Sequence, residues 1–415
     1  MRIVLANQWY PPESGWGGVG MYNYAVSRAY AELGHQVTVV ASRLATNIPA
    51  AHNANGVAVR RILVQDNYRL RRLPLLGRCV RPFQQLRYAR QVAQMLRALH
   101  AAQPIDVVEF ADVNAEGFFF ARQPCAPFVV RCHTPTFVLK NYYLPAEMPY
   151  DTRVISWCER ETIRRAHALT APSQDMANVI AADLKMDAAR FVVIPNALPQ
   201  EFSSFDFRFS IDPPTLRPPD PLTILHVGRL ERVKGVVTLA HAIPQVVAAI
   251  PHARFVFAGH DRPTGNGGSQ RAELETFFAQ QGVAHAVEFT GGIDQAELLE
   301  WYTRADICVV PSQLYESFSY TAAQAMAAGK PVVASRIGGI PETVDDGETG
   351  MLCEAGNPRE FADALIRLAS DAGLRERMGR AGRAKVAREF SPRRVAECNL
   401  QVYAAVRARF LGAAT

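Results

Sequence analysis

The chain has 415 residues, of which 49% are hydrophobic and 20% are charged, and its 45 lysines and arginines outnumber 39 acidic residues to give a formal charge of +6. This composition excludes a disordered chain, a coiled coil, a collagen and a small disulfide-stabilised protein. The length predicts two domains, each large enough to bury its own hydrophobic core.

Neither a membrane-spanning helix nor a secretory signal is predicted. The longest apolar runs, such as residues 191–195, are far shorter than the ~20 residues that a membrane span requires. Only residues 3–6 form an apolar run near the start, which is too short for a signal peptide. Seven cysteines without a Cys-x-x-Cys pair are typical of reduced thiols. We therefore expect a cytoplasmic protein.

Positive charge is concentrated between residues 60 and 100, where ten arginines accompany a single acid, Asp66. Arginine alternates there with leucine, valine and tyrosine, which predicts an amphipathic surface element. Such a surface could meet nucleic acid, an anionic membrane or a phosphorylated substrate, and an ordinary solvated helix face has the same pattern. Composition alone leaves these alternatives open.

Short β-branched runs alternate with helical patterns along most of the chain, which is typical of parallel sheets covered by helices on both faces. We therefore predict an α/β fold. A helix over residues 19–33, ended by Gly34, follows the first strand and forms a βαβ unit. The strands expected in the first half are residues 2–6, 37–41, 57–63, 107–110, 128–132, 169–171 and 192–194.

The alternation stops at residues 199–221, where paired prolines predict a linker. A last helix is expected from Ser391-Pro392 to about residue 409. The strands expected between these points are residues 223–227, 254–258, 287–290, 307–310, 331–334 and 350–353. The expected division is an N-terminal domain of residues 1–200, a linker of residues 201–221, a C-terminal domain of residues 222–390 and a terminal helix, residues 391–415, that packs back on the N-terminal domain.

A glycine-rich segment, Gly15-Trp16-Gly17-Gly18-Val19-Gly20, lies between the first strand and its helix and matches Gly-x-Gly-x-x-Gly. It begins about nine residues after the strand, whereas a dinucleotide-binding turn follows the strand directly. Arg43 after the second strand would suit NADP, so an NADP-dependent oxidoreductase is an alternative. The amides of Gly17 and Gly18 could equally approach a phosphate or a sugar, and a flexible turn would have the same composition.

In the second domain, the strand over residues 223–227 runs directly into Gly228, followed by Arg229 and Lys234 before a helix that starts near Gly235. In doubly wound sheets, ligands bind at the carboxyl ends of the strands, and two facing domains would enclose a cleft there. Two cations beside a helix N-terminus form a site for a diphosphate. A solvated loop can carry the same charges.

The strand over residues 307–310 leads into a loop that contains Glu316 and then into a helix that begins at residues 319–321. A carboxylate beside helix-start amides places hydroxyl recognition next to phosphate recognition, as a nucleotide sugar requires. Gln324, one turn into this helix, would reach the ribose; alternatively, it is a polar residue on a semi-exposed helix. The donor-binding candidates of this domain are Gly228, Ser319, Tyr320, Thr321 and Gln324.

At these residues the chain resembles the retaining glycosyltransferases of family 4, which have the GT-B fold of two facing Rossmann-like domains. The resemblance is carried by Val227-Gly228-Arg229 with Lys234-Gly235, by residues 305–318, and by residues 325–335. The family has two glutamates separated by seven residues; Glu316 matches the first, but Gln324 occupies the second position. A neutral amide accepts a hydrogen bond from ribose more weakly than a carboxylate does, so we expect altered donor affinity or nucleotide preference rather than lost activity.

The resemblance implies a role for each matching residue. Arg229 and Lys234 would neutralise the donor diphosphate as the leaving group departs, and Glu316 would hold hydroxyls of the donor sugar. From the first domain, Gly18 would face the diphosphate or the reacting sugar, and His133 would contact the sugar near its anomeric carbon. The alternative for His133 is a buried structural histidine.

Glycosyl transfer develops negative charge on the leaving oxygen, which fixed cations and helix amides can stabilise without a metal. The resemblance implies retention of the anomeric configuration, with the departing phosphate as base. No Asp-x-Asp pair or His/Cys spacing predicts a metal site, so neither a metal nor another cofactor is expected.

We therefore predict a cytoplasmic, metal-independent, retaining glycosyltransferase that moves a sugar from a nucleoside-diphosphate sugar to a hydroxyl acceptor in polysaccharide or glycolipid synthesis. The acceptor would be a sugar, a lipid-linked compound or a small molecule. The arginines of the first domain, which carries the acceptor site by resemblance, favour peripheral association with the inner membrane face, and no nucleic-acid partner is expected. Besides the oxidoreductase, a non-catalytic nucleotide-sugar-binding protein is an alternative.

Overall fold

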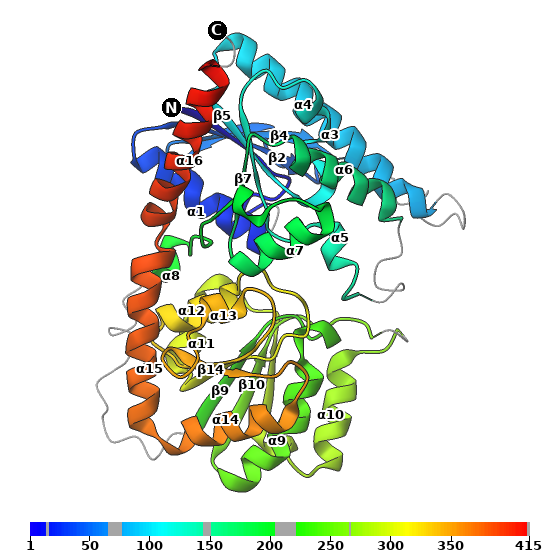
Figure 1. Ribbon diagram of the computed structural model, residues 1–415. Helices are drawn as coiled ribbons and strands as arrows, with labels where there is room; N and C mark the ends of the chain where they lie inside the picture. The colour runs from blue at the N-terminus through cyan, green and yellow to red at the C-terminus, as the bar shows by residue number, and fades with distance from the viewer. Residues whose placement is uncertain (14–15, 65–76, 144–150, 204–220, 265–266, 413–415) are drawn as a thin grey trace. The chain divides into compact units, whose positions relative to one another are not determined.

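The computed structural model describes residues 1–13, 16–64, 77–143, 151–203, 221–264 and 267–412 (Figure 1). The chain forms two compact units: residues 1–199 together with 391–415, and residues 200–390. Each unit is built on one sheet of mainly parallel strands, which confirms the predicted α/β class. Most of the expected linker, residues 204–220, lies outside the described residues, and residues 201–203 belong to a short helix, α8 (Gln200–Ser203).

Within the described residues, the N-terminal unit contains an eight-stranded sheet in the order β3-β4-β2-β1-β5-β6-β7-β8. Every neighbouring pair is parallel except β3 and β4, which form an antiparallel hairpin at the edge. The strands are β1 (Arg2–Ala6), β2 (Gln36–Arg43), β3 (Ala51–Ala54), β4 (Val57–Leu63), β5 (Val107–Ala111), β6 (Phe128–Arg131), β7 (Ala168–Ala171) and β8 (Phe191–Val193).

Strand β3 was not predicted, because its sequence, Ala-His-Asn-Ala, has no β-branched residue. The signal that could have revealed it is the turn that follows. Asn55 and Gly56 both have positive φ, at 50° and 78°, and Asn-Gly is the preferred pair for a tight hairpin turn. The other predicted strands are confirmed, with ends that differ by one or two residues.

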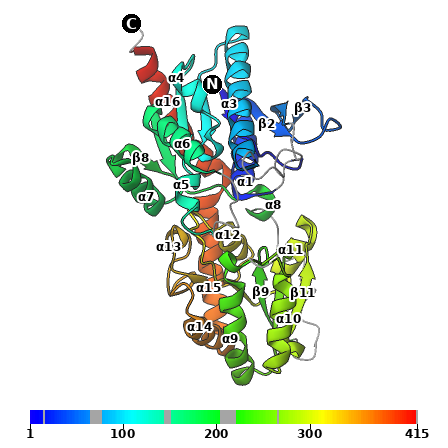
Figure 2. The same ribbon diagram turned by 90° about the vertical axis from the view of Figure 1, so that its right-hand side faces the viewer.

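Helices cover both faces of the N-terminal sheet (Figures 1 and 2). On one face, α1 and α16 pack together and share a core with β1, β2 and β4. On the other, α4 lies between α3 and α6. The helices of this unit are α1 (Gly18–Glu32), α3 (Gly77–Ala102), α4 (Phe118–Arg122), α5 (Thr136–Leu139), α6 (Arg153–Arg165), α7 (Gln174–Leu184) and α16 (Pro392–Gly412).

Helix α16 is bound to this unit by buried hydrogen bonds as well as by apolar packing. Asn399 Nδ2 donates to the hydroxyls of Tyr22 and Tyr30, at 2.8 Å each. The Tyr403 hydroxyl donates to Glu109 at 2.6 Å. Burial raises the pKa of Glu109, while the hydrogen bonds from Tyr403 and Tyr22 and the charge of Arg131 lower it in part.

The C-terminal unit contains a six-stranded parallel sheet in the order β11-β10-β9-β12-β13-β14. The order reverses between β9 and β12, and in such sheets the crevice at the carboxyl ends of the two strands at the reversal is the usual ligand site. The strands are β9 (Leu222–Val227), β10 (Ala253–Ala258), β11 (Val287–Gly291), β12 (Ile307–Val310), β13 (Val332–Ser335) and β14 (Gly350–Cys353).

Helices α9 and α14 lie beside each other and contribute most of the helical side chains of this core. None of the helices in the described residues combines the length and apolarity that a bilayer span needs. The helices of the C-terminal unit, after α8, are α9 (Val236–Ala249), α10 (Gln270–Gln280), α11 (Gln295–Arg304), α12 (Tyr320–Ala327), α13 (Ile340–Thr343), α14 (Pro358–Ser370) and α15 (Ala372–Lys385).

Candidate active site

Two loops meet at the reversal point of the C-terminal sheet. The loop after β9 ends at Gly235, where φ is +74° and an added Cβ would lie 1.6 Å from the carbonyl oxygen of Pro311. Only glycine fits this close approach. The contact is continued by hydrogen bonds from the amides of Gln313 and Leu314 to the carbonyl oxygen of Val233, at 2.9 and 2.8 Å. The loop after β9 is therefore bound directly to the loop after β12.

This contact brings Lys234 and Glu316 together. Lys234 Nζ lies 2.8 Å from Glu316 Oε1, and the hydroxyl of Ser312 donates to the same oxygen at 2.9 Å. The backbone of Glu316 is also held, because the amide of Gly339 donates to its carbonyl oxygen at 2.7 Å. Two predicted site residues thus form one hydrogen-bonded pair at the carboxyl edge of the sheet.

The charge of this pair depends on opposing effects at Glu316. Burial raises the pKa of the carboxyl, whereas the nearby ammonium of Lys234 and hydrogen bonds from Lys234, Ser312 and Ser319 lower it. The net pKa lies below its usual value. The site therefore presents a carboxylate and an ammonium at neutral pH, the charges needed to hold sugar hydroxyls and a diphosphate.

Arg229 stands apart from this pair. Its guanidinium lies 2.7 Å from Glu231 Oε1, and its side chain is 42% exposed. The arginine side of this pair faces solvent, whereas the Glu231 side chain is only 16% exposed and its Oε1 is buried. The guanidinium can therefore reach a ligand phosphate, at the cost of leaving a buried carboxylate oxygen without its cation. Gly228, which joins β9 to Arg229, donates its amide to the carbonyl oxygen of Ala258 at 2.9 Å.

Helix α12 begins beside Glu316, as predicted. Ser319 is its N-cap, and its hydroxyl accepts from the amide of Ala322 at 3.3 Å. Tyr320 and Thr321 are the first two residues of the helix. The N-terminal end of α12, with its partial positive charge, thus lies in the loop that carries the carboxylate.

Gln324 is not on a semi-exposed surface, so that alternative is wrong. The residue is only 5% exposed, and its Oε1 accepts a hydrogen bond from the hydroxyl of Tyr302 at 3.1 Å. Tyr302 lies on α11 and is itself fully buried. The amide oxygen expected to meet the ribose therefore has a protein partner in this structure, a partner that the sequence did not indicate.

The glycine loop and His133 belong to the N-terminal unit. Gly15 lies outside the described residues, Gly17 is the extended N-cap of α1, and Gly18 is the first residue of that helix. Both Gly17 and Gly18 are exposed, and a Cβ on Gly17 would meet no atom within 4 Å. Packing within the unit thus does not require glycine at position 17.

The structure does not form a dinucleotide-binding turn at this loop. Strand β1 ends at Ala6 and helix α1 begins only at Gly18, so no tight turn connects the strand to the helix. Arg43 donates to the carbonyl oxygen of Ile48 in its own loop at 3.1 Å. These features give no support to the NADP alternative.

His133 follows β6 and is buried against the ring of Tyr22, with ring centroids 5.0 Å apart. Its amide donates to Asp112 Oδ1 at 3.0 Å. Burial lowers the pKa of His133 well below its usual value, and the charge of Arg131 lowers it further. The imidazole is therefore neutral and can donate or accept a hydrogen bond, in keeping with either alternative stated for it.

Sequence reasoning missed the cation beside His133. Arg131 is completely buried at the end of β6, and its Nη2 donates to the carbonyl oxygen of Ile194 at 2.6 Å and to Asn196 Oδ1 at 2.8 Å. Its guanidinium also lies over the ring of Tyr22, 4.7 Å from the centroid. The one available signal was a charged residue that ends an otherwise apolar strand.

Among the described residues, no three His, Cys, Asp or Glu side chains gather as a metal site. The arrangement of Lys234 and Glu316 can bind a diphosphate next to a polyhydroxylated group, and it lies at the reversal of a Rossmann-like sheet. Together with a second Rossmann-like unit, this defines the class of protein as a GT-B glycosyltransferase.

Comparison with known proteins agrees with this assignment. Residues 16–202 match Glycosyltransferase Family 4, and residues 207–385 match Glycosyl transferases group 1. The chain belongs to this family of glycosyltransferases. It is 31% identical over 292 residues to D-inositol 3-phosphate glycosyltransferase of Streptomyces bingchenggensis, a match that covers 69% of this chain and 63% of that relative's length.

Solved structures share the fold over the full length. Sucrose-phosphate synthase of Thermosynechococcus elongatus is 23% identical with a TM-score of 0.77, and the alignment covers 100% of both chains. Alr3699/HepE of Anabaena in complex with UDP-glucose is 19% identical with a TM-score of 0.68, covering 98% of this chain and 100% of that one. The predicted GT-B fold is confirmed.

Proposed function

We propose that this chain transfers a glycosyl group from a nucleoside-diphosphate sugar to a hydroxyl acceptor, with retention of configuration and without a metal ion. The observation that carries the proposal is the Lys234–Glu316 pair at the reversal point of the C-terminal sheet, with the start of α12 in the same loop. A cation, a carboxylate and a helix N-terminus in one place match the chemistry of such a donor, because it carries negative phosphates beside neutral hydroxyls.

In the proposed reaction, the bond between the anomeric carbon and the diphosphate oxygen breaks, and the pair of electrons leaves with the diphosphate. Lys234 would stabilise this developing negative charge, together with Arg229 once it leaves Glu231. The acceptor hydroxyl bonds to the anomeric carbon and gives its proton to the departing phosphate. Because Glu316 already accepts from Lys234 and Ser312, it is suited to holding sugar hydroxyls rather than to attacking carbon.

The donor nucleoside is proposed to be uridine. Support comes from the Anabaena protein of the same fold, whose structure holds UDP-glucose. Ribose hydroxyls would meet Gln324 at α12, where the Tyr302 hydroxyl now occupies the amide oxygen. Binding would therefore require the amide oxygen to accept a second hydrogen bond or the Tyr302 contact to open.

The test combines donor binding with product analysis. We expect UDP-glucose to bind the wild-type protein, with Lys234→Ala weakening binding at least tenfold in calorimetry. Arg271→Ala is the matched control, because it removes an exposed cation from α10 of the same unit. Retention and metal independence are tested by NMR of the product's anomeric proton and by turnover in excess EDTA. Inverted product, or activity abolished by EDTA and restored by Mg²⁺, would refute those two parts.

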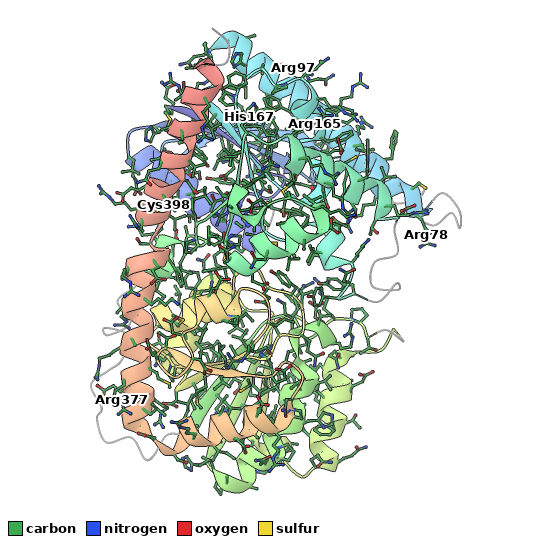
Figure 3. All side chains as sticks on the ribbon, viewed as in Figure 1. Arg78, Arg97, Arg165, His167, Arg377 and Cys398 are labelled. Atoms are coloured by element: carbon green, nitrogen blue, oxygen red, sulfur yellow. The ribbon has the colours of Figure 1, made fainter. Side chains whose placement is uncertain are left out.

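We also propose that the acceptor can be presented at a membrane surface. Helix α3 exposes arginines 78, 81, 87 and 90, and Phe83 on the same helix is 66% exposed (Figure 3 labels Arg78 near one end and Arg97 toward the other). Basic and aromatic side chains together favour an anionic lipid surface. The test is co-sedimentation with vesicles that contain 30 mol% phosphatidylglycerol, roughly a typical anionic fraction. At low salt, the wild-type protein should sediment with the vesicles, whereas the double variant Phe83→Ser, Arg87→Ser should stay in the supernatant.

A further inference from the structure

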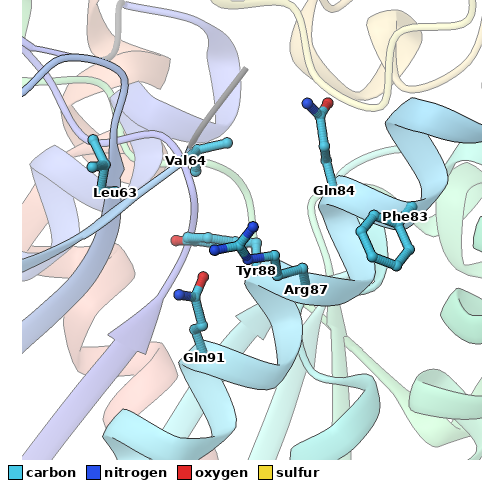
Figure 4. Close-up of a pocket in the computed structure, with 7 residues that line it drawn as sticks. All are labelled: Leu63, Val64, Phe83, Gln84, Arg87, Tyr88 and Gln91. Atoms are coloured by element: carbon cyan, nitrogen blue, oxygen red, sulfur yellow. The ribbon is translucent and has the colours of Figure 1, made fainter. Parts of the chain in front are cut away.

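A cavity of about 350 Å³ lies at the carboxyl edge of the N-terminal sheet. Its walls include Gln8 after β1, Leu44 after β2 and Val64 after β4, and α3 closes it from the side. The volume is within the range of small-molecule sites. An adjoining depression shares Val64 and Tyr88, and Figure 4 shows Tyr88 extending from α3 toward the end of β4.

Two polar groups in this wall are buried and have no hydrogen-bond partner among the described residues. The hydroxyl of Tyr88, a residue 3% exposed, and the Oε1 of Gln85, a residue 9% exposed, have no hydrogen-bond partner in the part of the chain that the structure describes. A buried polar group left unpaired costs about 1–3 kcal/mol. Burial also raises the pKa of Tyr88 well above its usual value, so its hydroxyl keeps its proton and can donate. A ligand in the cavity would satisfy both groups.

The free oxygen of Gln85 is one end of a chain of amides. Gln85 Nε2 donates to Asn114 Oδ1, and Asn114 Nδ2 donates to Gln8 Oε1 at 3.2 Å. The backbone amide of Asn114 donates to the buried Glu159 at 2.9 Å and so holds the residue in place. The chain ends in one acceptor, at Gln85, and one donor, the NH₂ of Gln8. Reversing all three amides would still leave one donor and one acceptor.

We propose that this cavity binds a neutral polyhydroxylated ring, a hexose or a cyclitol, which serves as the acceptor; the acceptor role rests on the proposed transfer reaction. A hydroxyl both donates and accepts, so hydroxyls on adjacent carbons can satisfy both ends of the amide chain and Tyr88. Trp9 and Leu44 supply apolar wall for the C–H face of such a ring.

A phosphate group does not match the polar groups of the inner wall of this cavity. A phosphate monoester is largely deprotonated at neutral pH, so the accepting end of the amide chain, Gln85 or Gln8 according to the orientation of the amides, would face its oxygens without a donor. Glu116 lies behind Gln8, and the backbone amide of Gln8 donates to both of its carboxyl oxygens at 3.0 Å. A carboxyl group at this place adds no attraction for an anion. Arg81 lines the cavity but is exposed, so an anionic substituent could only be accommodated toward solvent.

The test measures ring binding directly, without donor, so that it is independent of the transfer reaction. Calorimetry or saturation-transfer NMR would compare D-glucose and myo-inositol as free rings, maltotriose as a ring at a glycan end, and inorganic phosphate. The variant is Tyr88→Phe, which removes only the unpaired hydroxyl. Tyr30→Phe is the control, because its buried hydroxyl is bonded to Asn399 and Tyr403 on the same unit.

We expect at least one ring compound to bind and Tyr88→Phe to weaken that binding about tenfold, without lowering Tm. Tyr30→Phe should lower Tm and leave ring binding unchanged. Maltotriose alone would identify a glycan end as the source of the ring, which also supports the proposal. The proposal is overturned if only phosphate binds, if no ring binds, or if Tyr88→Phe lowers Tm without changing affinity. Loss of UDP-glucose binding or transfer with ring binding intact would instead count against the proposed function.

Discussion

The hydroxyl of Tyr302 donates to Gln324 Oε1 across 3.1 Å, joining α11 to α12 beside the proposed donor site. The resemblance to family 4 places a glutamate where this chain has Gln324. A carboxylate there would accept charge-assisted hydrogen bonds from ribose, about twice as strong as those of an amide. It would also be buried, and a buried charge without a cation is costly.

Gln324→Glu should therefore raise the affinity for UDP and lower the stability of the unliganded protein. We expect UDP to bind roughly three- to tenfold more tightly, while the free energy of unfolding without ligand falls by about 1–3 kcal/mol. Calorimetry with UDP and thermal unfolding with and without UDP measure the two effects. Unchanged UDP affinity in this variant would mean that position 324 does not contact the nucleotide.

The contact between the two loops at Gly235 should be required for UDP binding. Gly235→Ala adds a Cβ that would lie 1.6 Å from a backbone oxygen, so the two loops must separate and UDP binding should be lost. Gly267→Ala is the matched control, because its φ of +81° is similar but a Cβ there meets nothing within 4 Å. The control should lose only about 1 kcal/mol. Similar losses of stability and binding in both variants would show that backbone conformation, not the loop contact, is what matters.

The Lys234–Glu316 pair should give the protein a stability term that disappears in acid. The lowered pKa of Glu316 means that the carboxylate stabilises the fold above the pKa of the unfolded chain, near 4.5. This contribution is lost as the pH falls through the lower pKa of the folded state. Lys234→Met should therefore reduce the free energy of unfolding by about 1–2 kcal/mol at pH 7, and by less at pH 3. Urea unfolding at both pH values measures this, and an equal reduction at both would contradict an ionic origin.

Glu116 predicts the opposite dependence on pH. Burial raises its pKa to about 8, opposed in part by the hydrogen bond from the amide of Gln8. The folded state then holds a proton that the unfolded chain releases, so stability falls as the pH rises from about 4.5 to 8. Glu116→Gln keeps an acceptor for Gln8 but cannot ionise, so the fall between pH 5 and 8 should shrink by on the order of 2 kcal/mol. Thermal unfolding at several pH values checks this, and parallel curves for the two proteins would refute it.

The regular strands were predictable because parallel strands buried on both faces are continuous apolar runs, such as residues 3–6 or Ile307–Val310. The short strand β3 was missed because a polar edge strand depends on its hairpin turn and not on burial. Lys234 and Glu316 could be assigned to one edge of the sheet because each follows a strand, at the end where parallel strands place their ligands.

The sequence by itself determined the α/β class, the family and the residue types of the donor site, because strand periodicity and short motifs are local properties of the chain. The partners of those residues were decided only by the tertiary structure. Gln324 meets Tyr302, Arg131 donates to Ile194 and Asn196, and Gln85 reaches Gln8 through Asn114. Each of these contacts joins separate elements, and the residues that share a hydrogen bond across such distances are selected by packing, which no local pattern encodes.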